Sequence, residues 1–72
     1  MDEFVIRGEY IQLDQLLKVM GWVHSGGAAH KAVEVGLVQV DGAIEQRKRA
    51  KLRPGQIVVF NDEQVCLTRA KA

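Results

Sequence analysis

Residues 25–53 read SGGAAHKAVEVGLVQVDGAIEQRKRAKLR, and this stretch decides how the chain is organised. It contains three features: small residues at the start of a helix (25–27), the turn pair Asp41-Gly42, and a basic run at residues 47–53. We expect the flanking segments to hold these three features together around one small core.

The first feature begins a helix that is predicted from about Gly26 to Val35. Ser25 is a favourable N-cap, because its hydroxyl can accept a hydrogen bond from the first turn, and Gly36 is a typical residue for ending a helix. The spacing predicts a buried face of Ala28, Ala29, Ala32 and Val33 and an exposed face of His30, Lys31 and Glu34. Gly26 and Gly27 weaken the first turn. Two explanations stay open: their free N–H groups approach an anion, or the glycines pack tightly against a neighbouring loop.

After this helix, apolar residues recur at every second position, which is the pattern of a strand. Asp41-Gly42 is a strong signal for a two-residue hairpin turn between residues 38–40 and 43–45. After the basic run, Pro54-Gly55 predicts the centre of a type II turn. The remaining predicted elements follow in order: a buried strand at 56–60, a turn at Asn61-Asp62, a last strand at 64–68 and a frayed tail at 69–72.

Toward the N-terminus, the pattern predicts one strand and one helix. Residues 4–6 are aromatic and β-branched, which favours a short strand. One helical face is predicted by apolar residues at i, i+3, i+4 and i+7, namely Leu13, Leu16, Leu17 and Met20. Gly21 is placed to end this helix. Trp22 is expected to fold back over the helix end as core or rim of the core, with base stacking as the less favoured alternative.

The element order predicts a single α+β domain over residues 1–72, in which two short helices pack on a small antiparallel sheet. The 72 residues include 47% hydrophobic and 26% charged residues, which are ordinary globular values that leave room for one small core and no deep active site. Cys66 is the only cysteine, so no internal disulfide is possible. No segment reads as a signal peptide or a membrane span. We expect a monomeric cytoplasmic protein with no membrane partner.

Charge is distributed unevenly along the chain. The formal net charge is only +1, but residues 46–53 carry five basic side chains and no acidic one. A single concentrated positive site favours a local contact with a polyanion over a protein that coats nucleic acid on all sides. The alternative is an ordinary solvated loop.

Candidate catalytic and metal-binding residues form no motif. His24 and His30 stand six residues apart without a second cysteine, which argues against a zinc site. Gly26-Gly27 lacks the lysine and hydroxyl residues of a phosphate-binding P-loop. We therefore predict a protein that is not an enzyme and needs no cofactor or metal.

Taken together, the order and spacing of these features over residues 12–60 resemble the S4-type RNA-binding domain, whose helix–helix–hairpin unit is called the alpha-L motif. The matching residues are Leu13-Asp14, Leu17, Gly21, Ser25, Ala29, His30-Lys31, Gly36, Val38, Val40, Asp41-Gly42 and Pro54-Gly55. Small stand-alone bacterial proteins of the YbcJ type resemble the chain more closely still, through residues 16–18, 21–22, 40–43 and 47–49.

The resemblance implies that the partner is structured RNA, with ribosomal RNA as one candidate. It implies contacts from the start of the second helix, the hairpin and the basic run: Ser25, His30, Lys31, Gln39, Arg47, Lys48, Arg49 and Lys51. Gly26 departs from the family, which commonly has an arginine directly after the serine. Backbone amides of Gly26 and Gly27 would then substitute for the missing side chain. The alternative is a protein-interaction module whose basic run docks on an acidic partner.

The basic run also carries a geometric prediction. If the chain stays extended from Ile44 to Leu52, even positions face inward. The exposed side then carries a row of cations about 6 to 7 Å apart, near the phosphate spacing of a nucleic-acid strand, at Arg47, Arg49, Lys51 and Arg53.

Overall fold

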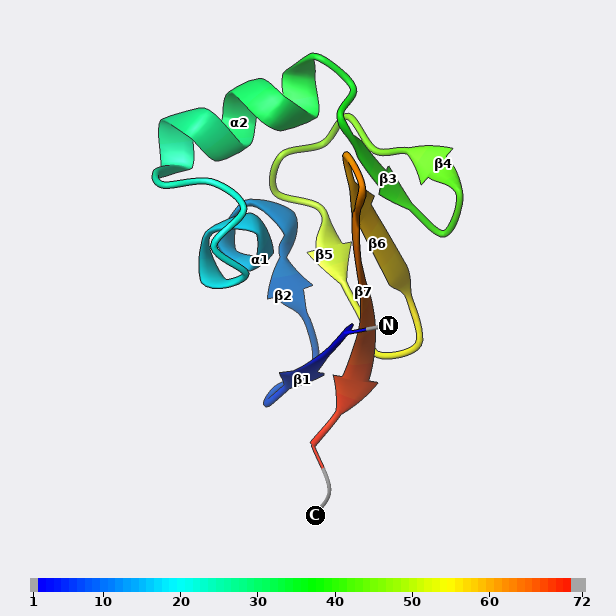
Figure 1. The fold of residues 1–72 in the computed structure, drawn as a ribbon. Coiled ribbons are helices and arrows are strands. Elements are labelled where there is room, and N and C mark those ends of the chain that lie inside the picture. Colours follow the sequence, from blue (N-terminus) through cyan, green and yellow to red (C-terminus); the bar gives the residue numbers. More distant parts are fainter. Residues whose placement is uncertain (1, 71–72) are drawn as a thin grey trace.

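The computed structural model describes residues 2–70 and has the α+β fold that the sequence predicts (Figure 1). The helices are α1 (Leu13–Val19) and α2 (Gly26–Glu34). The strands are β1 (Asp2–Ile6), β2 (Ile11–Gln12), β3 (Val38–Val40), β4 (Ala43–Ile44), β5 (Lys51–Leu52), β6 (Ile57–Phe60) and β7 (Glu63–Arg69). Figure 1 shows both helices at one end of the molecule, with β6 and β7 side by side and β7 running away from the helices toward the C-terminus.

The strands form two sheets. A five-stranded sheet has the order β1-β7-β6-β3-β4, and β2 pairs with β5 in a separate antiparallel ribbon. The larger sheet is mixed, because β1 runs parallel to β7 from the pair Asp2–Val65 to the pair Ile6–Arg69. The fold class is confirmed, but the predicted sheet was purely antiparallel. Parallel strands need a crossover connection, and local residue pattern does not reveal which distant strand a segment will join.

The predicted turns are present. Asp41 and Gly42 have φ values of 52° and 86°, which is the left-handed pair that a two-residue type I′ hairpin requires. Gly55 has a φ of 97°, and the Gln56 N–H donates to the Arg53 carbonyl (3.3 Å), as expected for a type II turn. The predicted frayed tail is wrong at its start, because Arg69 belongs to β7 and the Ala70 N–H donates to the Ile6 carbonyl (3.2 Å). The rest of that tail lies outside the described residues.

The core lies where the helices meet the sheet and the ribbon. Its buried side chains include Leu13, Leu16 and Leu17 of α1, Ala29 and Val33 of α2, and Ile6, Val38, Leu52, Val58, Val65 and Leu67 of the strands. Trp22 is half-buried and stacks on Phe60 with ring centroids 5.7 Å apart, so the prediction of a rim position is confirmed. Ala28 is exposed, contrary to expectation, because it lies about 100° around the helix from the buried Ala29.

Candidate nucleic-acid interface

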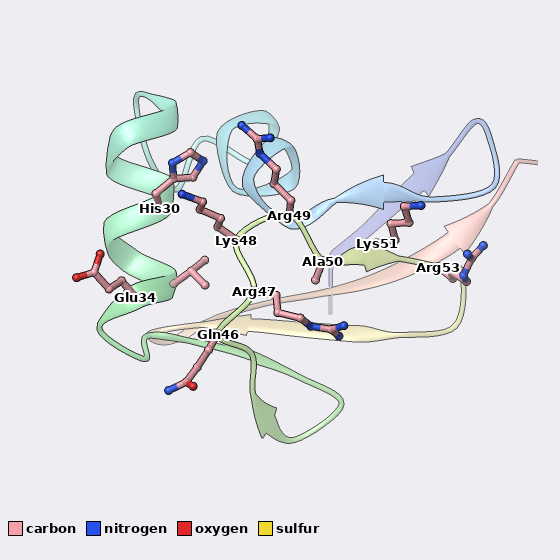
Figure 2. Close-up of a pocket in the computed structure, with 10 residues that line it drawn as sticks. His30, Glu34, Gln46, Arg47, Lys48, Arg49, Ala50, Lys51 and Arg53 are labelled. Carbon is pink, nitrogen blue, oxygen red and sulfur yellow. The ribbon is translucent and has the colours of Figure 1, made fainter.

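An open groove separates α2 from the segment that contains the basic run (Figure 2). We call it the basic groove; its volume is about 950 Å³, and it is lined by His30, Val33, Glu34, Gln46, Arg47, Lys48, Arg49, Ala50, Lys51 and Arg53. Figure 2 shows Lys48 reaching toward His30, with Lys51 and Arg53 farther along the groove. The structure thus brings all five clustered cations and His30 together in one place.

Main-chain hydrogen bonds fix the path of the basic run. The first-turn amides of α1 donate to it, from Leu13 to the Ala50 carbonyl (2.9 Å) and from Asp14 to the Lys48 carbonyl (3.0 Å). These amides have no partner within their own helix, so the loop satisfies them. Ala50 is buried, and its N–H donates to the Arg47 carbonyl (3.1 Å) in a local turn. The loop is therefore anchored by its backbone, while its charged side chains remain exposed.

The extended path predicted for the basic run is wrong. Residues 46–50 form no strand, and Ile44, expected to face inward, is 58% exposed. The turn that ends at Ala50 interrupts the alternation of buried and exposed side chains. This alternation holds only from Ala50 to Leu52. Lys48 is exposed together with the odd-numbered cations. The cations therefore line a curved groove rather than a straight row.

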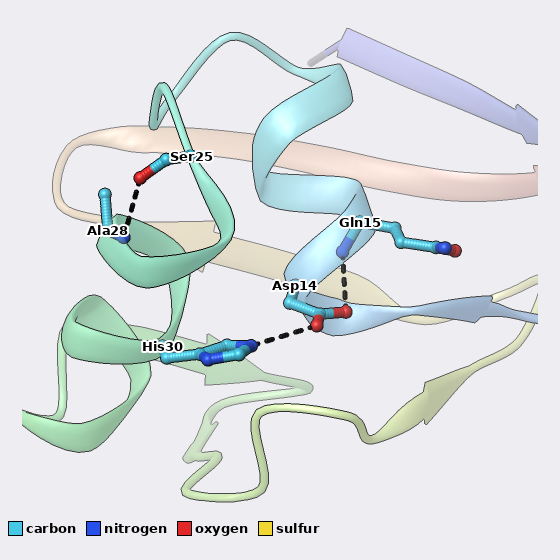
Figure 3. Close-up of polar contacts among 5 residues, drawn as sticks. All are labelled: Asp14, Gln15, Ser25, Ala28 and His30. Carbon is cyan, nitrogen blue, oxygen red and sulfur yellow. Dashed lines mark hydrogen bonds and ion pairs between the residues drawn. The ribbon is translucent and has the colours of Figure 1, made fainter.

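A carboxylate from α1 positions the histidine of the groove. His30 Nε2 lies 3.1 Å from Asp14 Oδ2, and Asp14 Oδ1 accepts a hydrogen bond from the Gln15 N–H (2.8 Å) (Figure 3). The Asp14 side chain is only 13% exposed. This contact joins the two helices and fixes the orientation of the imidazole ring at the wall of the groove.

Arg47 is held by an acidic neighbour that the sequence prediction did not include. Its Nε and Nη2 donate to the two carboxylate oxygens of Glu45 (3.1 and 3.2 Å), and its backbone N–H donates to Oε2 (3.1 Å). These hydrogen bonds from Arg47 lower the pKa of Glu45, and the carboxylate raises the pKa of Arg47. The Arg47 side chain is still 80% exposed. Glu45 therefore orients Arg47 but also competes with a bound anion for it.

The Glu45–Arg47 pair predicts a pH dependence of stability. Because the pKa of Glu45 is lowered in the folded state, the ionised carboxylate stabilises the fold at pH values above its unfolded-state pKa. This stabilisation is lost as the pH falls through the folded-state pKa. Between about pH 5 and pH 3, the free energy of unfolding should fall more steeply for the wild type than for Glu45→Gln. Urea denaturation across this range measures the difference. Parallel curves for the two proteins would show that the pair contributes nothing to stability.

The residues at the start of α2 lie outside the lining of the basic groove. Ser25 caps the helix as predicted, since its Oγ accepts a hydrogen bond from the Ala28 N–H (3.1 Å) (Figure 3). A Cβ at Gly27 would meet only Ser25 Oγ at 3.9 Å, and one at Gly26 would meet open space. Tight packing against a neighbouring loop therefore does not explain the two glycines. Of the two explanations, only the approach of an anion to the amides stays a prediction.

Two other predicted contact residues also lie outside the groove lining. Lys31 is exposed on α2, about 200° around the helix from the buried Ala29, so it points away from the core. Gln39 is exposed on the face of the sheet opposite to the buried Val38. These residues would reach an RNA only if it extends past the basic groove on either side.

The groove also has polar residues that sequence reasoning missed, Glu34 and Gln46. No motif marks either one; the helical spacing of Glu34 from His30 was the available signal, because residues four apart share a face. Among residues 2–70, no group of three or more His, Cys, Asp or Glu side chains is placed to hold a metal ion. No helix in the same range is long and apolar enough to span a membrane.

The fold and the groove define a small α+β domain that presents an open, cation-lined surface. The chain belongs to the S4 domain family, whose model matches residues 4–68. It is 46% identical over 56 residues to the "Putative RNA-binding protein YbcJ" of Escherichia coli (strain K12), covering 78% of this chain and 80% of that protein. The "Uncharacterized protein YbcJ" of Shigella flexneri gives the same identity and coverage.

A solved structure shows the same fold. The solution structure of YbcJ from E. coli, described as revealing an alfaL motif involved in RNA binding, matches with a TM-score of 0.72 at 40% identity. The match covers 94% of this chain and 87% of that one. The resemblance to the S4-type domain with an alpha-L motif is thereby confirmed.

Proposed function

We propose that this protein binds structured RNA, without catalysing a reaction, through the phosphates that its basic groove can reach. The observation that carries the proposal is the convergence of five exposed cations and His30 on one open groove whose loop is anchored by hydrogen bonds to α1. Membership of the S4 domain family and the RNA binding named for YbcJ support the choice of RNA.

The physical basis is electrostatic. Each cation that neutralises a phosphate releases condensed counterions, so binding should weaken linearly on a plot of log affinity against log salt. Arg49, Lys51 and Lys48 are exposed and free of acidic partners among the described residues, whereas Arg47 is shared with Glu45. We assign the main phosphate contacts to the first three, with Arg47, Arg53 and His30 beside them.

The start of α2 supplies a second contact in this proposal. The amides of Gly26 and Gly27 and the side chains of Ser25 and Lys31 would meet the backbone where it leaves the groove. Gln39 would make a contact at the hairpin. The proposal is for a monomeric cytoplasmic protein that recognises RNA shape more than sequence, with ribosomal RNA as one candidate.

A competition experiment tests the choice of nucleic acid. A labelled RNA hairpin is bound at low salt and then competed with the same unlabelled hairpin or with duplex DNA of equal length. We expect RNA to compete more strongly, because the described helices include no long recognition helix with polar residues that could enter a DNA major groove. Equal or stronger competition by DNA would contradict the proposal. Failure to bind either one, with capture of an acidic protein instead, would favour the protein-interaction alternative.

A further inference from the structure

An aromatic ring lies among the cations at one end of the basic groove. Lys51 Nζ is 5.1 Å and Arg53 Cζ is 5.9 Å from the centre of the Tyr10 ring. Both distances are within the range of cation–π contacts. The Arg53 guanidinium also donates to the Glu9 carbonyl (3.4 Å), which holds it beside Tyr10.

The β2–β5 ribbon creates this arrangement. Ile11 pairs with Leu52. Leu52 belongs to the core, and Ile11 packs against it. Because side chains alternate across a strand, Tyr10, Lys51 and Arg53 are placed on the opposite, outward face. Tyr10 is accordingly 38% exposed.

A second hollow begins at the same ring. It has a volume of about 500 Å³ and is lined by Phe4, Val5, Ile6, Arg7, Gly8, Tyr10 and Ile11. Tyr10 lies in the lining of this mostly apolar hollow, while Lys51 and Arg53, which contact its ring, line the basic groove. A ligand that follows the cations therefore meets an aromatic face and then an apolar recess with one arginine.

We propose that Tyr10 stacks on an unpaired RNA base where the strand leaves the basic groove. Phosphates on Lys51 and Arg53 would place the attached base over the ring, and the apolar hollow would shield it from water. Aromatic side chains beside cations are the usual platform for single-stranded nucleic acid. Bases inside a duplex are already stacked on their neighbours, so the base must be unpaired. This inference rests on the proposed function and names its ligand: structured RNA with a single-stranded flank.

The test compares two forms of one RNA hairpin, blunt-ended or carrying unpaired nucleotides at its end. The wild type should bind the extended form about 10-fold more tightly, the value expected for stacking one base. Tyr10→Ala should lose this preference and bind the two forms alike. Tyr10→Phe, the matched control, keeps the ring and should keep the preference.

Two results would overturn the inference. One is a wild type that binds both hairpins equally; the other is a Tyr10→Ala protein that weakens both equally, which means that the ring only positions Lys51 and Arg53. Either result leaves RNA binding intact, whereas the absence of binding to both hairpins removes the proposed function itself.

A crosslinking measurement on the wild type does not depend on how a variant folds. With 5-iodouridine in the unpaired extension, irradiation should join the RNA to Tyr10, and mass spectrometry of the digested complex identifies the residue. Crosslinks found only elsewhere on the chain would place the base away from Tyr10 and overturn the assignment.

Discussion

Replacing Lys48, Arg49 and Lys51 together with glutamate is expected to abolish RNA binding without unfolding the domain. All three side chains are exposed, and none belongs to the core. Main-chain hydrogen bonds to Leu13 and Asp14 hold the loop, and these do not depend on its side chains. Three attractive contacts with phosphates become three repulsive ones, so binding should fall below detection at physiological salt.

The neutral variant with glutamine at these three positions gives the quantitative test. The slope of log affinity against log salt should fall by about 2 to 3 units, at 0.7 to 0.9 for each lost phosphate contact. Arg47 is left unchanged because its pairing with Glu45 would mix two effects. A control with Lys18→Gln and Arg69→Gln removes exposed charge outside the groove and should leave the slope nearly unchanged. An unchanged slope in the triple variant, with a native circular dichroism spectrum, would show that the loop is not the main contact.

Local chemistry explains why much of the fold could be predicted. Asp41-Gly42 and Gly55 are residues that tolerate positive φ, and their turns fix where strands begin and end. Leucines at helical spacing identify the buried face of α1 in the same direct way. By contrast, the parallel pairing of β1 with β7 joins segments about 60 residues apart, and no local pattern specifies that partner.

The candidate site was predictable in its composition but not in its shape. Five cations within seven residues mark a concentrated positive site from the sequence alone, but charge by itself leaves a polyanion contact and a solvated loop as alternatives. The path of their loop depends on α1, whose first-turn amides bind the carbonyls of Lys48 and Ala50, and on the burial of Ala50. Tyr10 is a further case, because only the β2–β5 pairing brings it to Lys51 and Arg53. Residue propensities and hydrophobic periodicity do not reveal tertiary contacts of this kind.

Leu52→Ala is expected to destabilise the protein more than the substitution of any of the five cations of the basic groove. Leu52 is 1% exposed and packs in the core between the exposed Lys51 and Arg53. Removing its side chain should cost about 2 to 5 kcal/mol from lost burial and the cavity that remains. A domain of this length has a total stability near the lower end of about 5 to 15 kcal/mol. Urea denaturation should therefore show a much lower midpoint or a largely unfolded population.

Ile44→Ala is the matched control, because it removes a similar side chain just before the same loop. Ile44 is 58% exposed, so its loss should cost less than about 1 kcal/mol. Equal destabilisation by both variants would mean that Ile44 faces inward and that the loop follows the straight path expected from alternation.

RNA-binding measurements on Leu52→Ala separate the effect of lost stability from the effect of lost charge. Leu52→Ala keeps all five cations, so its apparent affinity should fall with the folded fraction while the salt slope of the folded protein stays at the wild-type value.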